Sequence, residues 1–74
     1  MKTLADLAVG EVATVRDLQF DDLAYVKRLQ ALGLRLGVEI KVLRKGLTGS
    51  PIHVKVNTTE LAIRQKDAKN IHIF

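Results

Sequence analysis

The feature that most restricts the fold is a single helical repeat with a clear beginning and end. Apolar residues recur at three-residue steps over positions 23–32, which places them on one side of a helix. Asp21 and Asp22 precede the repeat and supply its predicted N-cap. Gly33 follows it and is predicted to take positive φ as a C-cap, so that Leu34 folds back as the contact of a Schellman ending. Local signals therefore define one short helix.

The two sides of this helix differ in composition. At about 100° per residue, one side is apolar and is predicted to be buried, while the other carries small and basic residues and is predicted to face water. The apolar side holds Leu23, Tyr25, Val26, Leu29 and Leu32, and the outward side holds Ala24, Lys27, Arg28 and Ala31.

The remaining apolar residues lie in short runs that alternate with polar residues, as in strands with one wet face. Five short strands with one helix after the first predict a mainly β fold, a small and partly open barrel of the SH3-like type. The chain of 74 residues is long enough for one domain, residues 1–74. The predicted strands cover residues 11–18 (with an irregularity near the end), 39–44, 52–56, 61–63 and 71–74.

Turn residues separate the predicted strands. Gly37 lies where a tight turn over 35–38 requires positive φ. The loop 45–51 contains the only proline, Pro51. Asn57 is predicted to begin a hairpin turn, because asparagine tolerates positive φ. The polar stretch 65–70 is predicted to form a single helical turn.

Composition indicates an intracellular domain. The sequence contains no cysteine, so neither a disulfide nor a thiolate metal site can stabilise it. Apolar runs are far shorter than the roughly 20 residues of a membrane span, and the first residues lack the apolar core of a secretory signal. We therefore expect a cytoplasmic protein. The sequence carries no signature of a particular oligomeric state.

Charge is distributed unevenly along the chain. The net charge of +4 combines −3 over residues 1–26 with +7 over residues 27–74. Such asymmetry favours an acidic protein surface, a phosphate-bearing partner or nucleic acid. The alternative is a basic surface that only keeps the domain in solution.

Few residues of the sequence are candidates for metal binding or catalysis. His53 and His72 lie on separate predicted strands, and neither has a second ligand nearby, so we expect ordinary surface histidines, with weak Fe²⁺ or other divalent metal binding as the alternative. Helix capping accounts for Asp21 and Asp22, although with Asp17 they form a carboxylate cluster. No nucleophile motif or phosphate-binding loop is present. The sequence thus predicts no catalytic residues, no metal site, no required cofactor and no enzymatic activity.

The segment RLQALGLRLGV, residues 28–38, resembles the FeoA family, the small cytosolic proteins of bacterial and archaeal ferrous iron uptake. The resemblance extends over essentially the whole chain. Two positions depart from the family pattern: Leu36 stands where the family usually has proline, and Asn57 lies where many members have glycine nearby. The other matching segments are LADL (4–7) before Gly10, GSPI (49–52), LAIR (61–64) and DA (67–68).

The resemblance implies a fold and a partner. Family members are SH3-like barrels with an inserted helix, and they are encoded beside FeoB, a ferrous iron permease with a cytoplasmic GTPase domain. The chain would then be an accessory or regulatory protein of FeoB that meets the membrane only through this partner. A similar domain ends some iron-dependent repressors, but those carry a DNA-binding helix-turn-helix that this chain lacks.

The outward side of the helix is the predicted partner surface. Ala24 and Ala31 form a small flat strip with Lys27 and Arg28 at its borders, and Arg35 follows in the next loop. Small side chains let another chain approach closely, while the charges steer an acidic partner. The alternatives are a solvent-facing stripe, a basic nucleic-acid-binding barrel and a weak Fe²⁺ chaperone. Because aromatic residues are scarce, we expect no nucleic-acid partner.

Overall fold

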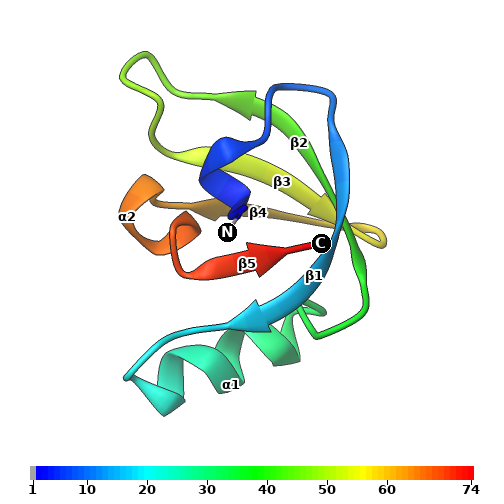
Figure 1. Ribbon diagram of the computed structural model, residues 1–74, viewed down its shortest axis with the longest axis vertical. Helices are drawn as coiled ribbons and strands as arrows, with labels where there is room; N and C mark the ends of the chain where they lie inside the picture. Colours follow the sequence, from blue (N-terminus) through cyan, green and yellow to red (C-terminus); the bar gives the residue numbers. More distant parts are fainter. Residues whose placement is uncertain (1) are drawn as a thin grey trace.

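Within residues 2–74, which the computed structural model describes, five antiparallel strands form one strongly curved sheet (Figure 1). The strand order is β4-β3-β2-β1-β5. This architecture confirms the predicted mainly β fold with one short helix after the first strand. The elements are η1 (Leu4–Asp6, a 3₁₀ turn), β1 (Val12–Leu18), α1 (Leu23–Ala31), β2 (Glu39–Lys45), β3 (Ile52–Val56), β4 (Thr59–Ile63), α2 (Gln65–Ala68) and β5 (Ile71–Ile73).

Strand alternation places aliphatic side chains on the inner side of the sheet. On β3, for example, Val54 and Val56 are fully buried, while Lys55 between them is exposed. The predicted irregularity in β1 is confirmed, because its register against β5 shifts between Val15 and Asp17. Such a bulge sharpens the local twist and lets one strand pair with both β2 and β5.

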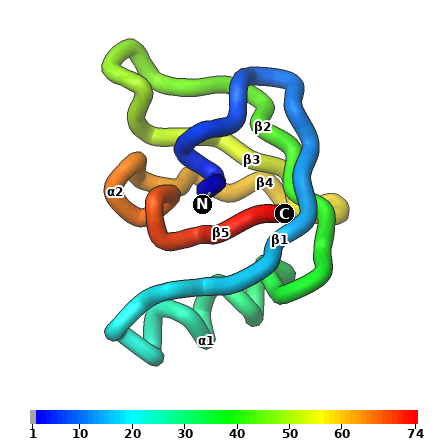
Figure 2. Tube along the Cα trace, in the orientation of Figure 1, coloured from blue at the N-terminus to red at the C-terminus, as the bar shows by residue number. Residues whose placement is uncertain are grey.

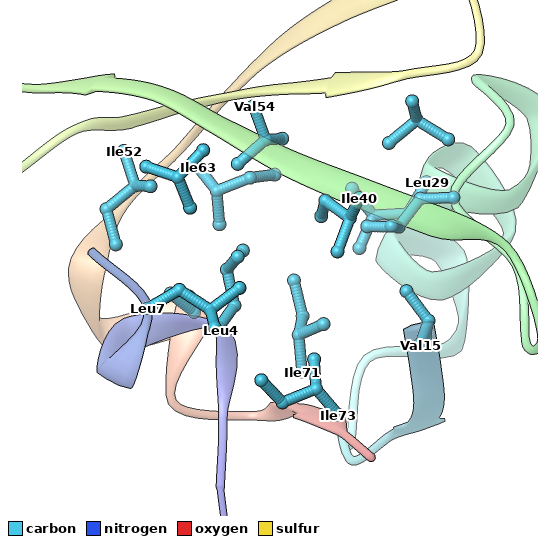
Figure 3. Packing of buried hydrophobic residues seen from close by; sticks show 14 residues of the cluster. Leu4, Leu7, Val15, Leu29, Ile40, Ile52, Val54, Ile63, Ile71 and Ile73 are labelled. Atoms are coloured by element: carbon cyan, nitrogen blue, oxygen red, sulfur yellow. The ribbon is translucent and has the colours of Figure 1, made fainter. Parts of the chain in front are cut away.

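The core is built from aliphatic residues of every strand and of η1 (Figure 3). Local sequence patterns did not predict η1, yet Leu4 in this turn and Leu7 directly after it are buried. The backbone N–H of Thr3 donates to Asp6 Oδ2 at 2.8 Å, and this bond is the largest cause of the lowered pKa of Asp6. Figure 2 shows η1 lying beside β5, where Thr3 bridges to His72. The buried residues are Leu4, Leu7, Val15, Leu29, Leu34, Ile40, Val42, Ile52, Val54, Val56, Ile63, Ala68, Ile71 and Ile73.

The ends of α1 follow the local signals, with one correction. The N-cap is Asp22, whose Oδ1 accepts from the N–H groups of Ala24 (3.0 Å) and Tyr25 (3.2 Å), so Asp21 is not the capping residue. Asp21 lies one position too early for its side chain to reach these groups. At the other end, Gly33 has φ +103°.

The C-terminal end of α1 is a complete Schellman motif. The Gly33 N–H donates to the Gln30 carbonyl at 3.0 Å, and the Leu34 N–H donates to the Leu29 carbonyl at 2.9 Å. Leu34 is fully buried, as predicted. The motif therefore anchors the helix to the core through Leu29 and Leu34.

The predicted buried side of α1 is wrong at its two ends. Leu29 is buried, Tyr25 and Val26 are partly buried, but Leu23 is 70% exposed and Leu32 44% exposed. The helix lies beside β1 at one end of the molecule (Figure 1). Because the strands and η1 already fill the core, only the middle of the helix meets it.

The predicted turns are confirmed. Gly37 has φ +86° in the turn 35–38, which the Val38 N–H closes by donating to the Arg35 carbonyl at 3.3 Å. Positive φ at this third position defines a type II turn, with Leu36 at the second position. Asn57 has φ +55° in the β3–β4 hairpin, and Pro51 ends the β2–β3 loop after a cis peptide bond.

Candidate functional site

The outward side of α1 is free of contacts with the core. Ala24, Lys27, Arg28 and Ala31 are all exposed, as the helical spacing predicts. Arg35 lies beyond the helix, but its Nε donates to the Gln30 carbonyl at 3.0 Å. Four of the five predicted partner-binding residues thus lie on one surface of α1. The fifth, Arg35, is hydrogen-bonded to the C-terminal end of the helix. We call these five residues the helix face.

A side-chain network fixes one border of the helix face. The Arg28 guanidinium lies 5.5 Å from the centre of the Tyr25 ring, and Phe20 packs edge-on against the same ring at 5.0 Å. The Tyr25 hydroxyl donates to Asp67 Oδ2 at 3.3 Å, and Arg64 Nε donates to the same oxygen at 3.3 Å. Arg28 is therefore held by a cation–π contact with Tyr25, and the hydrogen bond from Tyr25 to Asp67 links α1 to α2.

Burial is the main cause of a raised pKa at Tyr25, and the negative charge of Asp67 raises it further. Neutral pH lies well below even the ordinary tyrosine pKa of 10.0, so the hydroxyl is protonated and is a hydrogen-bond donor. Sequence reasoning missed this contact, because Tyr25 and Asp67 are 42 residues apart. The Arg64–Asp67 pair, by contrast, has a three-residue spacing that can be recognised in the sequence.

A hollow of about 290 Å³ adjoins this border. Carboxylates and guanidinium groups both line it, so its charge is mixed. The hollow is lined by Phe20, Asp21, Asp22, Tyr25, Arg28, Arg64 and Asp67.

Two exposed leucines add apolar surface at the other end of the helix. They are Leu32 and, in the following turn, Leu36, which is 59% exposed.

The two histidines lie on different parts of the sheet. His53 is on β3 and His72 is on β5, and β2 and β1 lie between these strands in the sheet order. Across residues 2–74, no group of three or more His, Cys, Asp or Glu side chains is placed to hold a metal ion. Weak metal binding by one or both histidines stays a prediction.

Comparison with known proteins identifies the family. The model of the FeoA domain family matches residues 2–73. The chain belongs to the FeoA family. None of the curated proteins compared with it matches the chain.

Solved FeoA structures share the fold over almost the whole chain. The FeoA protein of Chlorobium tepidum is 35% identical with a TM-score of 0.91, and the match covers 97% of this chain and 68% of that one. The iron(II) transport protein A of Clostridium thermocellum is 24% identical with a TM-score of 0.86, covering 97% of this chain and 44% of that one. The chain therefore spans only part of these proteins.

A third FeoA structure has nearly the same length as this chain. Stenotrophomonas maltophilia FeoA, solved with zinc, is 31% identical with a TM-score of 0.86, covering 100% of this chain and 91% of that one. It is described as a prokaryotic SH3 domain protein and a candidate activating factor of bacterial ferrous iron transport. The predicted SH3-like class is thereby confirmed.

Among the helices of residues 2–74, none is long and apolar enough to cross a membrane.

Proposed function

We propose that this FeoA chain is an accessory protein of ferrous iron uptake, which binds the cytoplasmic, GTPase-containing part of the FeoB permease. The match of the FeoA family over residues 2–73 carries this proposal. The description of the Stenotrophomonas maltophilia protein as a candidate transport-activating factor supports it. Binding is the proposed activity, and catalysis by the chain itself is not required.

The helix face is the proposed docking site on physical grounds. Ala24 and Ala31 leave a low surface on which another chain can pack closely, and neither is needed to fill the core. Lys27 and the Tyr25-supported Arg28 place positive charge along this surface. These charges favour an acidic patch on the partner and speed its association at low salt.

Two substitutions test the docking site. Ala31→Glu adds bulk and negative charge to an exposed position, so the fold should persist while binding to the cytoplasmic part of FeoB is lost. Arg28→Glu should weaken the complex most strongly at low salt, because screening reduces the effect of a surface charge as ionic strength rises. Lys69→Glu is the matched control, since this exposed lysine at the end of α2 lies outside the helix face.

Binding should be measured by calorimetry at two salt concentrations, with circular dichroism to verify folding. If Ala31→Glu and Arg28→Glu bind as tightly as the parent and the Lys69→Glu control, the docking site lies elsewhere. If the parent does not bind the FeoB fragment at all, the proposed function itself is wrong. A nucleic-acid role would instead give binding to oligonucleotides that weakens steeply with salt.

A further inference from the structure

A row of four residues crosses the outer side of the sheet. Val12, Lys41, Lys55 and Glu60 are opposite one another in register on β1, β2, β3 and β4. Lys41 and Lys55 are therefore direct cross-strand neighbours, and both are exposed. Like charges at directly opposite positions destabilise an antiparallel pair. The sheet thus holds two positive charges side by side in an unfavourable arrangement.

Neither lysine forms an ion pair with an acidic residue of the described part of the chain. Within residues 2–74, the ion pairs are Arg44–Glu60 at 3.7 Å and Arg64–Asp67 at 3.3 Å. Glu60 is opposite Lys55, but its carboxylate is closest to Arg44. Neither ammonium group is therefore held in an ion pair by the described residues, and both are available to an external anion.

The two lysines border a hollow of about 240 Å³. Val12, which is 49% exposed, contributes an apolar wall, and Asn57 in the β3–β4 hairpin contributes a side-chain amide. An anionic group that enters would meet two ammonium groups and an amide donor, while its methylene groups would contact Val12. The hollow is lined by Val12, Glu39, Ile40, Lys41, Lys55 and Asn57.

One lining residue of the hollow, Asn57, lies near the end of α1. A β-carbon added to Gly33, the residue after the C-cap of the helix, would lie 3.8 Å from Asn57 Nδ2, which is van der Waals contact. Asn57 therefore connects the wall of the hollow to the C-terminal end of the helix face. One partner can extend across both surfaces.

We propose that this hollow binds the carboxylates of an acidic segment of the protein partner. Acidic residues limit the positive area on two sides, because Glu39 lines the hollow and Glu60 ends the row. A long polyanion such as nucleic acid would meet these carboxylates, and no aromatic residue lines the hollow for base stacking. One or two aspartate or glutamate side chains fit this short, bounded charge pattern better.

The inference rests on the proposed function only for the identity of the partner. The hollow itself can be tested without FeoB, by following the backbone amides of the ¹⁵N-labelled protein by NMR. The probe is a short capped peptide with three consecutive glutamates, added at low salt. We expect shifts at residues 39–41 and 55–57, which diminish as salt is added.

The decisive variant is Lys41→Gln with Lys55→Gln. It removes the repulsion between the lysines, so the protein should stay folded, and it should bind the peptide roughly three- to tenfold more weakly, as expected for two exposed ion pairs. Lys66→Gln with Lys69→Gln is the matched control, because it removes the same charge from exposed positions around α2. This control should bind the peptide as the parent does.

Three outcomes would overturn the inference. The first is that the double variant binds the peptide as well as the control does. The second is that inorganic phosphate shifts these amides while the peptide does not, which indicates a small-anion site. The third is that a single-stranded oligonucleotide binds here more tightly than the peptide. If the peptide binds as expected but the FeoB fragment does not bind the parent protein, the acidic-segment site stands and the proposed function fails.

Discussion

Replacing Gly33 with alanine isolates the energetic cost of the helix ending. At φ +103°, a residue with a β-carbon is strained by about 1–2 kcal/mol. The added β-carbon would lie 3.8 Å from both Asn57 Nδ2 and Val56 Cγ1, so it meets no steric clash. The loss should therefore come from the backbone alone. For a domain of this size it corresponds to a fall in Tm of roughly 4–16 °C.

Thermal and urea unfolding followed by circular dichroism measure this loss. Gly33→Asn is the informative control, because asparagine tolerates left-handed backbone geometry and should lose less stability than alanine. An alanine variant that is as stable as the parent would refute the reasoning. It would mean that the helix ends at the same place without the left-handed residue.

Three further predictions concern a turn, a cap and the histidines. Leu36→Pro should raise the free energy of unfolding by about 0.4–1 kcal/mol, because the second position of a type II turn suits proline; a lower Tm would contradict this turn assignment. The lowered pKa of Asp6 stabilises the fold above the ordinary value of 3.8, and this contribution is lost as pH falls. The free energy of unfolding, measured with urea, should therefore fall less for Asp6→Asn than for the parent when the pH is lowered from neutral to about 3. If it falls equally in both proteins, the bond between Thr3 and Asp6 has no such role. His53 and His72 should not form a tight site, so a sub-micromolar Kd for Zn²⁺ in calorimetry, abolished by changing either one to alanine, would disprove this.

Local signals predicted the parts of the fold that depend on neighbours in the sequence. The Schellman ending at Gly33, the hairpin turn at Asn57 and the alternation of β3 each involve residues within about six positions of one another. Such patterns specify backbone geometry directly. The resemblance to the FeoA family was carried mainly by the segment 28–38, which contains the Schellman ending, and the family match over residues 2–73 confirmed it.

Contacts between distant segments could not be predicted in this way. Leu23 and Leu32 fit the apolar period of α1, but their exposure depends on how much of the helix the finished core can cover. Leu4 and Leu7 are too few to show a period, although they fill the core from η1. The Tyr25–Asp67 hydrogen bond supports Arg28 at the helix face, and nothing in either local sequence indicates it.

Charge illustrates why the folded arrangement matters for the partner. Along the sequence, negative charge lies mainly before residue 27 and positive charge after it. In the fold, Asp21 and Asp22 line the same hollow as Arg28 and Arg64, so both signs meet at the N-terminal end of α1. Lys41 and Lys55, in contrast, remain together without an acidic partner among residues 2–74. Selection of an acidic partner should therefore depend more on the lysine pair of the sheet than on the charges of the helix. The Lys41→Gln/Lys55→Gln variant should flatten the salt dependence of binding more than Lys27→Gln/Arg28→Gln, which removes the same number of charges.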